Sequence, residues 1–125
     1  MSVSKKDGMT LAEAAEGFIA HVEQEGKSAI TVRAYRSDLR LAERFFGAET
    51  ALARLTVPWV GKFLKSEALN QRPNGTPKKP ASISRAKGVL RMMLEWAVAQ
   101  GHLENVPLPK GEQRRAKRAN VDATQ

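Results

Sequence analysis

The chain contains no cysteine, so neither a disulfide framework nor a thiolate metal site is available to it. Its two histidines, His21 and His102, lie far apart in the sequence and have no acidic partners at ligand spacing, which argues against a metal site. There is no Gly-rich phosphate loop, nucleophile elbow or His-x-x-x-His pattern. We therefore expect no catalytic residues, metal or cofactor in this chain.

Long apolar runs are also missing, so nothing in the sequence is long enough to cross a bilayer. The N-terminus lacks an apolar segment followed by a small-residue cleavage site, the pattern of a secretory signal. We expect a cytoplasmic protein with no membrane role. At 125 residues, the length predicts one domain with tails.

Positive charge is abundant and unevenly placed. Lys and Arg number 21 against 13 acids, a net charge of +8. Residues 1–26 hold two lysines and five acids, so the remainder carries +11. A basic body behind an acidic first segment indicates that one side meets nucleic acid. An anionic membrane surface would fit the charge equally. However, a helix that binds a membrane surface exposes large apolar residues beside its basic ones, and the large apolar residues of this chain follow core patterns.

Apolar residues recur every three or four positions in four stretches and predict four helices. The first follows a capping box of Thr10 and Glu13 and ends near Gly26. The second runs from an N-cap at Ser28 to Gly47, the third from Thr56 to about Leu69, and the fourth from Ser82 to Gly101. No strand pattern or internal repeat is present, so we predict an all-α bundle of four main helices.

The second helix carries two stripes at once. Its apolar stripe consists of Val32, Tyr35, Leu39, Ala42 and Phe46, and its basic stripe of Arg33, Arg36, Arg40 and Arg44. A basic stripe is often no more than a solvated face. This one has four arginines, no lysine and only Glu43 as a neighbouring acid. Arginine is suited to bidentate contact with phosphates and base edges, which favours an anionic partner.

The fourth helix has a broad apolar stripe with polar flanks. Ser84, Lys87 and Arg91 lie on one flank, and Arg85 lies on the other. Gly88, in the middle, costs about 1 kcal/mol relative to alanine, which predicts a close helix crossing there.

Two polar segments flank the fourth helix. Residues 70–81 form a turn-rich linker whose lysines serve either solubility or phosphate binding. After Pro107 and Pro109 comes a basic tail typical of a flexible linker or a nucleic-acid arm.

Taken together, these helices resemble the N-terminal core-binding (SAM-like) domain of tyrosine recombinases, the family of phage integrases. The second helix is similar in Thr31, Tyr35, the Asp38-Leu39-Arg40 triplet and the Phe45-Phe46 pair. The third and fourth are similar in Thr56, Val60, Phe63, Leu64, Ser82, Ile83, Arg85, Leu90, Arg91 and Trp96. The family's closing Asn-Pro pair departs from the pattern, since Val106 separates Asn105 from Pro107.

The resemblance implies half of a DNA clamp. It places the second and fourth helices at the major groove of duplex DNA at a recombination site, with the first helix able to touch a neighbouring protomer. Arg33 and Arg85 are then expected near bases, with phosphate contacts from Thr31, Arg36, Ser37, Arg40, Ser82, Ser84, Lys87 and Arg91. The tail bases Arg114, Arg115, Lys117 and Arg118 would follow the DNA backbone.

The resemblance also divides the chain. It implies a core-binding domain over 10–106 and a linker over 107–125 towards a catalytic domain that is absent here, while the polar composition of residues 1–9 predicts a disordered segment. The family's catalytic residues, including its tyrosine nucleophile, belong to that later domain. We accordingly expect a monomeric, non-enzymatic DNA-binding module.

Other functions compete with this hypothesis. A helical protein-interaction module whose basic face meets an acidic partner would show the same charge. A helix-turn-helix repressor requires two helices joined by three or four residues, which the long connection over residues 70–81 disfavours. A complete enzyme is the least supported reading.

Overall fold

The computed structural model describes residues 8–109, and this part of the chain is helical throughout its regular structure. Its elements in order are α2 (Leu11–Gln24), α3 (Ala29–Phe46), the 3₁₀ turn η1 (Leu52–Arg54), α4 (Val57–Leu64), α5 (Glu67–Asn70) and α6 (Pro80–Ala99). The predicted all-α bundle is confirmed. The basic tail with Arg114, Arg115, Lys117 and Arg118 lies outside the described residues.

Local capping chemistry sets where the helices begin. The Thr10 hydroxyl accepts from the Glu13 amide at 3.2 Å, and the Glu13 carboxylate accepts from the Thr10 amide at 3.0 Å, which is the predicted capping box. The Ser28 hydroxyl caps α3 through the Thr31 amide at 3.2 Å. Gly47 ends α3 with a φ of 101°, a conformation that disfavours any residue with a Cβ.

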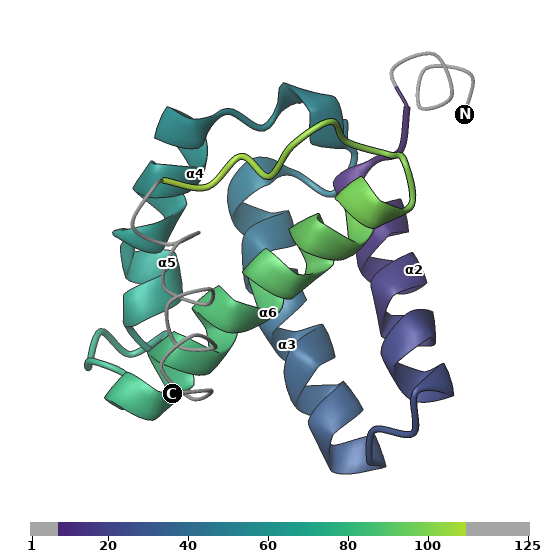
Figure 1. Cartoon of the computed structure of the whole chain (residues 1–125). Coiled ribbons are helices and arrows are strands. Elements are labelled where there is room, and N and C mark those ends of the chain that lie inside the picture. Colours follow the sequence, from purple (N-terminus) through teal and green to yellow (C-terminus); the bar gives the residue numbers. More distant parts are fainter. Residues whose placement is uncertain (1–7, 110–125) are drawn as a thin grey trace, which may run out of the picture.

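Helix α3 lies at the centre and packs against both α2 and α6. Figure 1 shows α6 crossing α3 diagonally, with α2 beside α3 and joined to it by a short turn. The predicted apolar stripe of α3 faces inward: Val32, Leu39, Ala42 and Phe46 are buried, and Tyr35 is half-buried against the core. Its opposite face is thereby left to solvent.

The third predicted helix is two helices rather than one running to Leu69. Ser66 causes the break, because its hydroxyl donates to the Phe63 carbonyl at 2.7 Å and accepts from the Leu69 amide at 3.2 Å. It therefore ends α4 and caps α5. The fourth helix begins at Pro80, two residues before the predicted start, since proline fits the first turn without losing a hydrogen bond.

The prediction of a close helix crossing at Gly88 is wrong. A Cβ at Gly88 would meet nothing nearer than the Arg91 side chain, at 3.8 Å. The close approach occurs instead at Gly17 of α2, where a Cβ would lie 2.5 Å from the Trp96 ring of α6. Gly17 thus allows α2 and α6 to pack closely.

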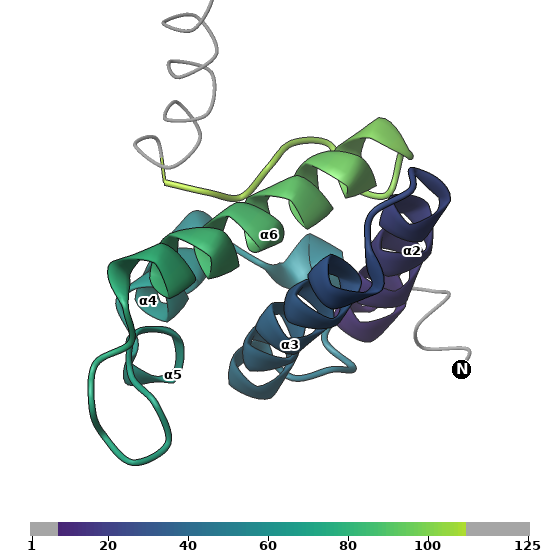
Figure 2. The ribbon, with the colours of Figure 1, turned by 90° about the horizontal axis from the view of Figure 1, so that it is seen from below.

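Residues 71–79 form a closed loop before α6. An isolated bridge joins Gln71 to Pro77, and the Arg72 amide donates to the Thr76 carbonyl at 2.8 Å. Across the tip, the Asn74 side chain accepts from the Thr76 amide at 3.1 Å. Figure 2 shows this loop projecting on the same side of α6 as α3.

The segment after α6 turns back over the bundle. In Figure 1 it runs from the end of α6 towards α4. Leu108 is only 2% exposed and belongs to the main core, and Pro109 lies 3.7 Å from a Cβ built at Gly61 of α4. This segment is part of the folded unit.

Candidate nucleic-acid interface

The solvent face of α3 carries a row of arginines that we call the α3 row: Arg33, Arg40 and Arg44. All three are exposed. At about 100° per residue they fall, together with Ser37, within an arc of about 60° opposite the buried stripe. Within residues 8–109 no carboxylate forms a salt bridge with any of the three. Their guanidinium groups are therefore available to an external anion.

Arg36, at the edge of the same face, is partnered. Its Nη1 donates to both Glu16 carboxylate oxygens of α2, at 3.0 and 3.2 Å. The Glu16 side chain is 70% exposed, so the pair is open to water and weak. A phosphate could displace this carboxylate at small cost.

Arg85 is held by a much less exposed carboxylate. Its Nε donates to Asp38 Oδ2 at 2.8 Å and its Nη2 to Asp38 Oδ1 at 3.0 Å. The Asp38 side chain is 6% exposed and that of Arg85 is 45% exposed. These hydrogen bonds raise the pKa of the Arg85 guanidinium. The pair ties the first turns of α6 to the middle of α3 and leaves the outer edge of the guanidinium facing solvent.

The remaining predicted contacts on α6 lie elsewhere. Arg91 and Arg85 are about 120° apart around the helix, and Lys87 lies near Arg91. Arg91 is half-buried: its Nε has no hydrogen-bond partner among the described residues, and Glu95 Oε2 lies 3.9 Å away. Lys87 and Arg91 thus occupy a different flank of α6 from Arg85.

The predicted hydroxyl contacts have mixed surroundings. Thr31 accepts from the Ser28 hydroxyl at 3.1 Å within the N-cap of α3. Ser84 is exposed on α6. Ser37 and Ser82 lie close together across the α3–α6 junction, where both line one pocket. The structure therefore gathers Ser37, Ser82 and Arg85 in one place.

That pocket, which we call the loop pocket, has a volume of about 380 Å³ and lies between α3, the 71–79 loop and the start of α6. Its lining consists of Ser37, Asp38, Leu41, Arg44, Arg72, Pro73, Lys78, Ser82 and Arg85. Lys78 is half-buried there. Burial lowers the pKa of its ammonium, as do the neighbouring Arg85 and Arg72 charges, while Asp38 opposes the shift.

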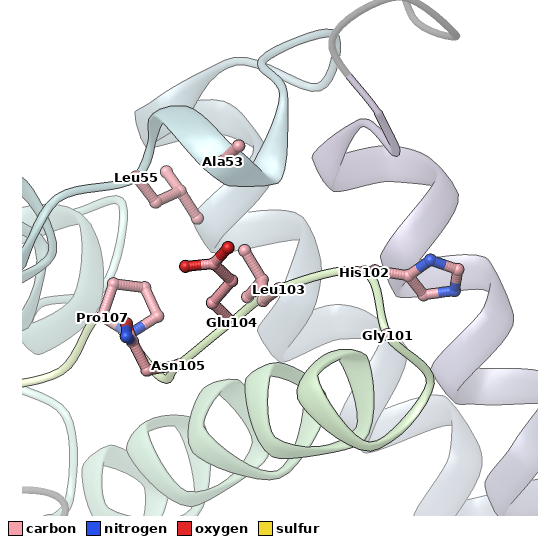
Figure 3. Close-up of a pocket in the computed structure, with 8 residues that line it drawn as sticks. All are labelled: Ala53, Leu55, Gly101, His102, Leu103, Glu104, Asn105 and Pro107. Carbon is pink, nitrogen blue, oxygen red and sulfur yellow. The ribbon is translucent and has the colours of Figure 1, made fainter.

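A second pocket, of about 460 Å³, lies beneath the segment that follows α6. Figure 3 shows Leu103 and Glu104 between Leu55 on one side and Asn105 and Pro107 on the other. Its lining contains no lysine or arginine, so it does not suit an anion.

Sequence reasoning missed the partner of Arg85 and the convergence of loop and helix cations. A signal for the first was present: Asp38 is an acid at the margin of the apolar stripe of α3. A carboxylate placed there requires a cation from a neighbouring helix. No sequence signal predicted that Arg72 and Lys78 would reach α3, because the closed shape of the loop arises from its own hydrogen bonds.

Within residues 8–109, no group of three acidic or histidine side chains could hold a metal ion. No helix in the same range is long and apolar enough to span a membrane.

Comparison with known proteins gives one match. A family model described as "Phage integrase, N-terminal SAM-like domain" matches residues 15–101. No curated protein and no solved structure matched the chain. The matched range covers α3, α4, α5, α6 and most of α2. With that range and an all-α fold, the chain belongs to the family of phage integrase N-terminal SAM-like domains.

Proposed function

We propose that this domain binds duplex DNA as the core-binding half of a tyrosine recombinase clamp, with α3 and α6 at the major groove. The observation that carries the proposal is the α3 row, since Arg33, Arg40 and Arg44 are exposed on one face and form no salt bridge with a carboxylate among residues 8–109. Membership of the integrase family supports the choice of DNA as the anion. Phosphate contacts dominate such binding and make it salt-dependent.

Arg33 is the best candidate for a contact near a base. It lies in the second turn of α3, is exposed, and projects from the face opposite the core. Ile30, one turn earlier on that face, is 78% exposed. An apolar group beside an arginine suits a major-groove edge that offers both acceptors and thymine methyls.

Arg85 acts differently under this proposal. Its two bonds to Asp38 fix the guanidinium plane, so the arginine would meet DNA already oriented. Part of its donor set is occupied by Asp38, which favours a phosphate contact over a full bidentate base contact. Arg36 would reach a phosphate by exchanging Glu16 for it.

The test is a duplex titration at two or more salt concentrations with wild type and the double variant Arg33→Ala/Arg40→Ala. Neither residue has an ion-pair partner within the described chain, so the fold should survive. We expect weak binding by the wild type and loss of affinity in the variant, with a salt slope reduced by about two. Equal binding by both proteins would contradict the role of α3, and an acidic protein bound in place of DNA would favour an interaction module.

A further inference from the structure

The loop pocket gathers positive charge from three separate elements. Arg44 comes from α3, Arg72 and Lys78 from the 71–79 loop, and Arg85 from α6. Two hydroxyls, those of Ser37 and Ser82, complete the polar lining. Guanidinium, ammonium and hydroxyl groups converging on one concavity are the donors that proteins use for phosphate.

The single carboxylate in the lining does not cancel this charge. Both Asp38 oxygens accept from Arg85, so they are already occupied. Three further cations, Arg44, Arg72 and Lys78, remain around the same space. An adjoining hollow of about 350 Å³ shares these three and adds Glu67. The cations still outnumber the acids across both hollows.

Hydrogen bonds of the loop fix the Arg72 side chain and the backbone at Lys78. The Arg72 Nη1 donates to the Pro77 carbonyl at 2.9 Å, across the base of the loop. The Lys78 amide donates to the Asn70 carbonyl at 3.0 Å, which anchors the end of the loop to α5. Both side chains are therefore presented by a closed loop, which reduces the entropy lost on binding.

Crowding of like charges supplies a driving force. Arg85 and Arg72 each lower the pKa of Lys78 because both charges repel its ammonium, while Asp38 attracts it and acts in the opposite direction. A dianion or monoanion placed among them would relieve that repulsion. The pocket beneath the segment after α6, by contrast, carries Glu104 and no lysine or arginine, so a basic lining is not a general property of hollows in this fold.

We propose that the loop pocket binds one phosphate group, and that in the DNA complex this is a backbone phosphate next to the groove that α3 enters. The inference rests on the proposed DNA-binding function for the source of the phosphate. The loop would then act as a third contact point beside α3 and α6. Ser37 joins the pocket to the α3 row, so a single DNA strand could follow both.

The experiment compares the loop variant Arg72→Gln/Lys78→Gln with a control, Lys62→Gln/Lys65→Gln. The control removes the same charge from exposed lysines at the end of α4, outside the pocket. Wild type, loop variant and control are titrated with a duplex over a range of salt concentrations. Thermal melts establish that all three are folded. Lys78→Gln alone, which leaves the bond from Arg72 to the Pro77 carbonyl in place, provides a second variant should the double change impair folding.

We expect the control to bind as the wild type does, and the loop variant to lose affinity with a salt slope lower by about one. Lys78→Gln alone should lose affinity in the same direction. If the loop variant and the control bind DNA with the same affinity and salt slope, the proposal is overturned.

Titration with inorganic phosphate, read by amide NMR shifts, separates this proposal from the wider function. Wild type that does not bind DNA but shows phosphate-dependent shifts over residues 71–79 would refute the DNA function and retain the pocket as an anion site. DNA binding without any effect of the loop variant would refute the pocket alone. No response to either ligand would overturn both.

Discussion

The two flanks of α3 are held by different physical means. Towards α2 the contact is apolar, with Phe18 stacked on Tyr35, and the one ion pair that residues 8–109 form there, Arg36–Glu16, lies in water. Towards the start of α6 the contact is a charge pair with a buried carboxylate, Asp38–Arg85, and further cations beside it. One flank is built for packing, and the other keeps polar groups at its surface.

This difference bears on function because a polar group that is engaged within the fold is not available to bind a ligand. On the α2 flank, the exposed Arg36–Glu16 pair contributes little to stability, so the fold does not depend on Arg36. On the α6 flank Arg85 serves both the fold and the surface, since it neutralises Asp38 and stays 45% exposed. Variants that separate these roles test the contrast.

The largest effect is expected from Arg85→Ala. It leaves the Asp38 carboxylate buried without its partner, which should cost about 1–3 kcal/mol of unfolding free energy. The matched variant Arg36→Ala leaves only the exposed Glu16 and should cost less than about 1 kcal/mol. Urea unfolding of both proteins measures the difference. Equal losses would erase the distinction between the flanks.

The second prediction concerns the apolar contact of α2 with α6, next to the α2 flank of α3. Gly17→Ala places a Cβ 2.5 Å from the Trp96 ring, so α2 or the ring must shift. Overpacking costs about 1–3 kcal/mol, and the better helix propensity of alanine returns up to about 1 kcal/mol. We expect a net loss in thermal stability with a changed Trp fluorescence. A variant with wild-type stability and spectrum would show that this contact is loose.

The third prediction concerns Gly88, which, unlike Gly17, has room for a Cβ. Gly88→Ala meets only the Arg91 side chain at an ordinary 3.8 Å, so nothing opposes the gain in helix propensity. We expect the variant to be more stable by about 0.5–1 kcal/mol. A calorimetric melting temperature at or below that of the wild type would show that a Cβ at this position is opposed within the fold itself.

The smallest effect is expected at Glu43, near the α2 flank. Burial raises the pKa of this carboxyl, as does Glu16, while Arg40 opposes the shift. Because the folded pKa lies above the unfolded value, the protonated group stabilises the fold at pH below about 4.5, and this contribution disappears as pH rises through the folded pKa. Glu43→Gln should therefore gain slightly at pH 7 and lose that gain in acid. Stability curves that run parallel across pH would contradict this.

The sequence predicted the parts that depend on periodicity. The apolar stripes and caps placed α2, α3 and α6 because helical spacing and end chemistry are local properties. Ser66 escaped notice because a serine inside an apolar pattern gives no sign that it will end one helix and start another. The prediction at Gly88 was wrong for a related reason. Helix propensity gives the energetic cost of a glycine, but it does not show which glycine lies against a side chain of another helix.

The site was harder to predict than the fold. Exposure of Arg33 and Arg40 followed from their position opposite the apolar stripe. The partner of Arg85 is 47 residues away in sequence, so its identity depends on how the helices cross. The convergence of Arg72 and Lys78 on α3 likewise depends on tertiary packing, which no local pattern encodes.

The buried Leu108 has a practical consequence for anyone who moves this domain between proteins. The family match ends at residue 101, yet the chain beyond it covers the core as far as Leu108, and at the other end the match begins inside α2. A graft cut at the family boundaries would remove the segment that covers the core at Leu108 and, at the other end, the first turn of α2 with its capping residue Thr10. Chimeras should instead be joined outside residues 9–109, where the seams leave the interior closed.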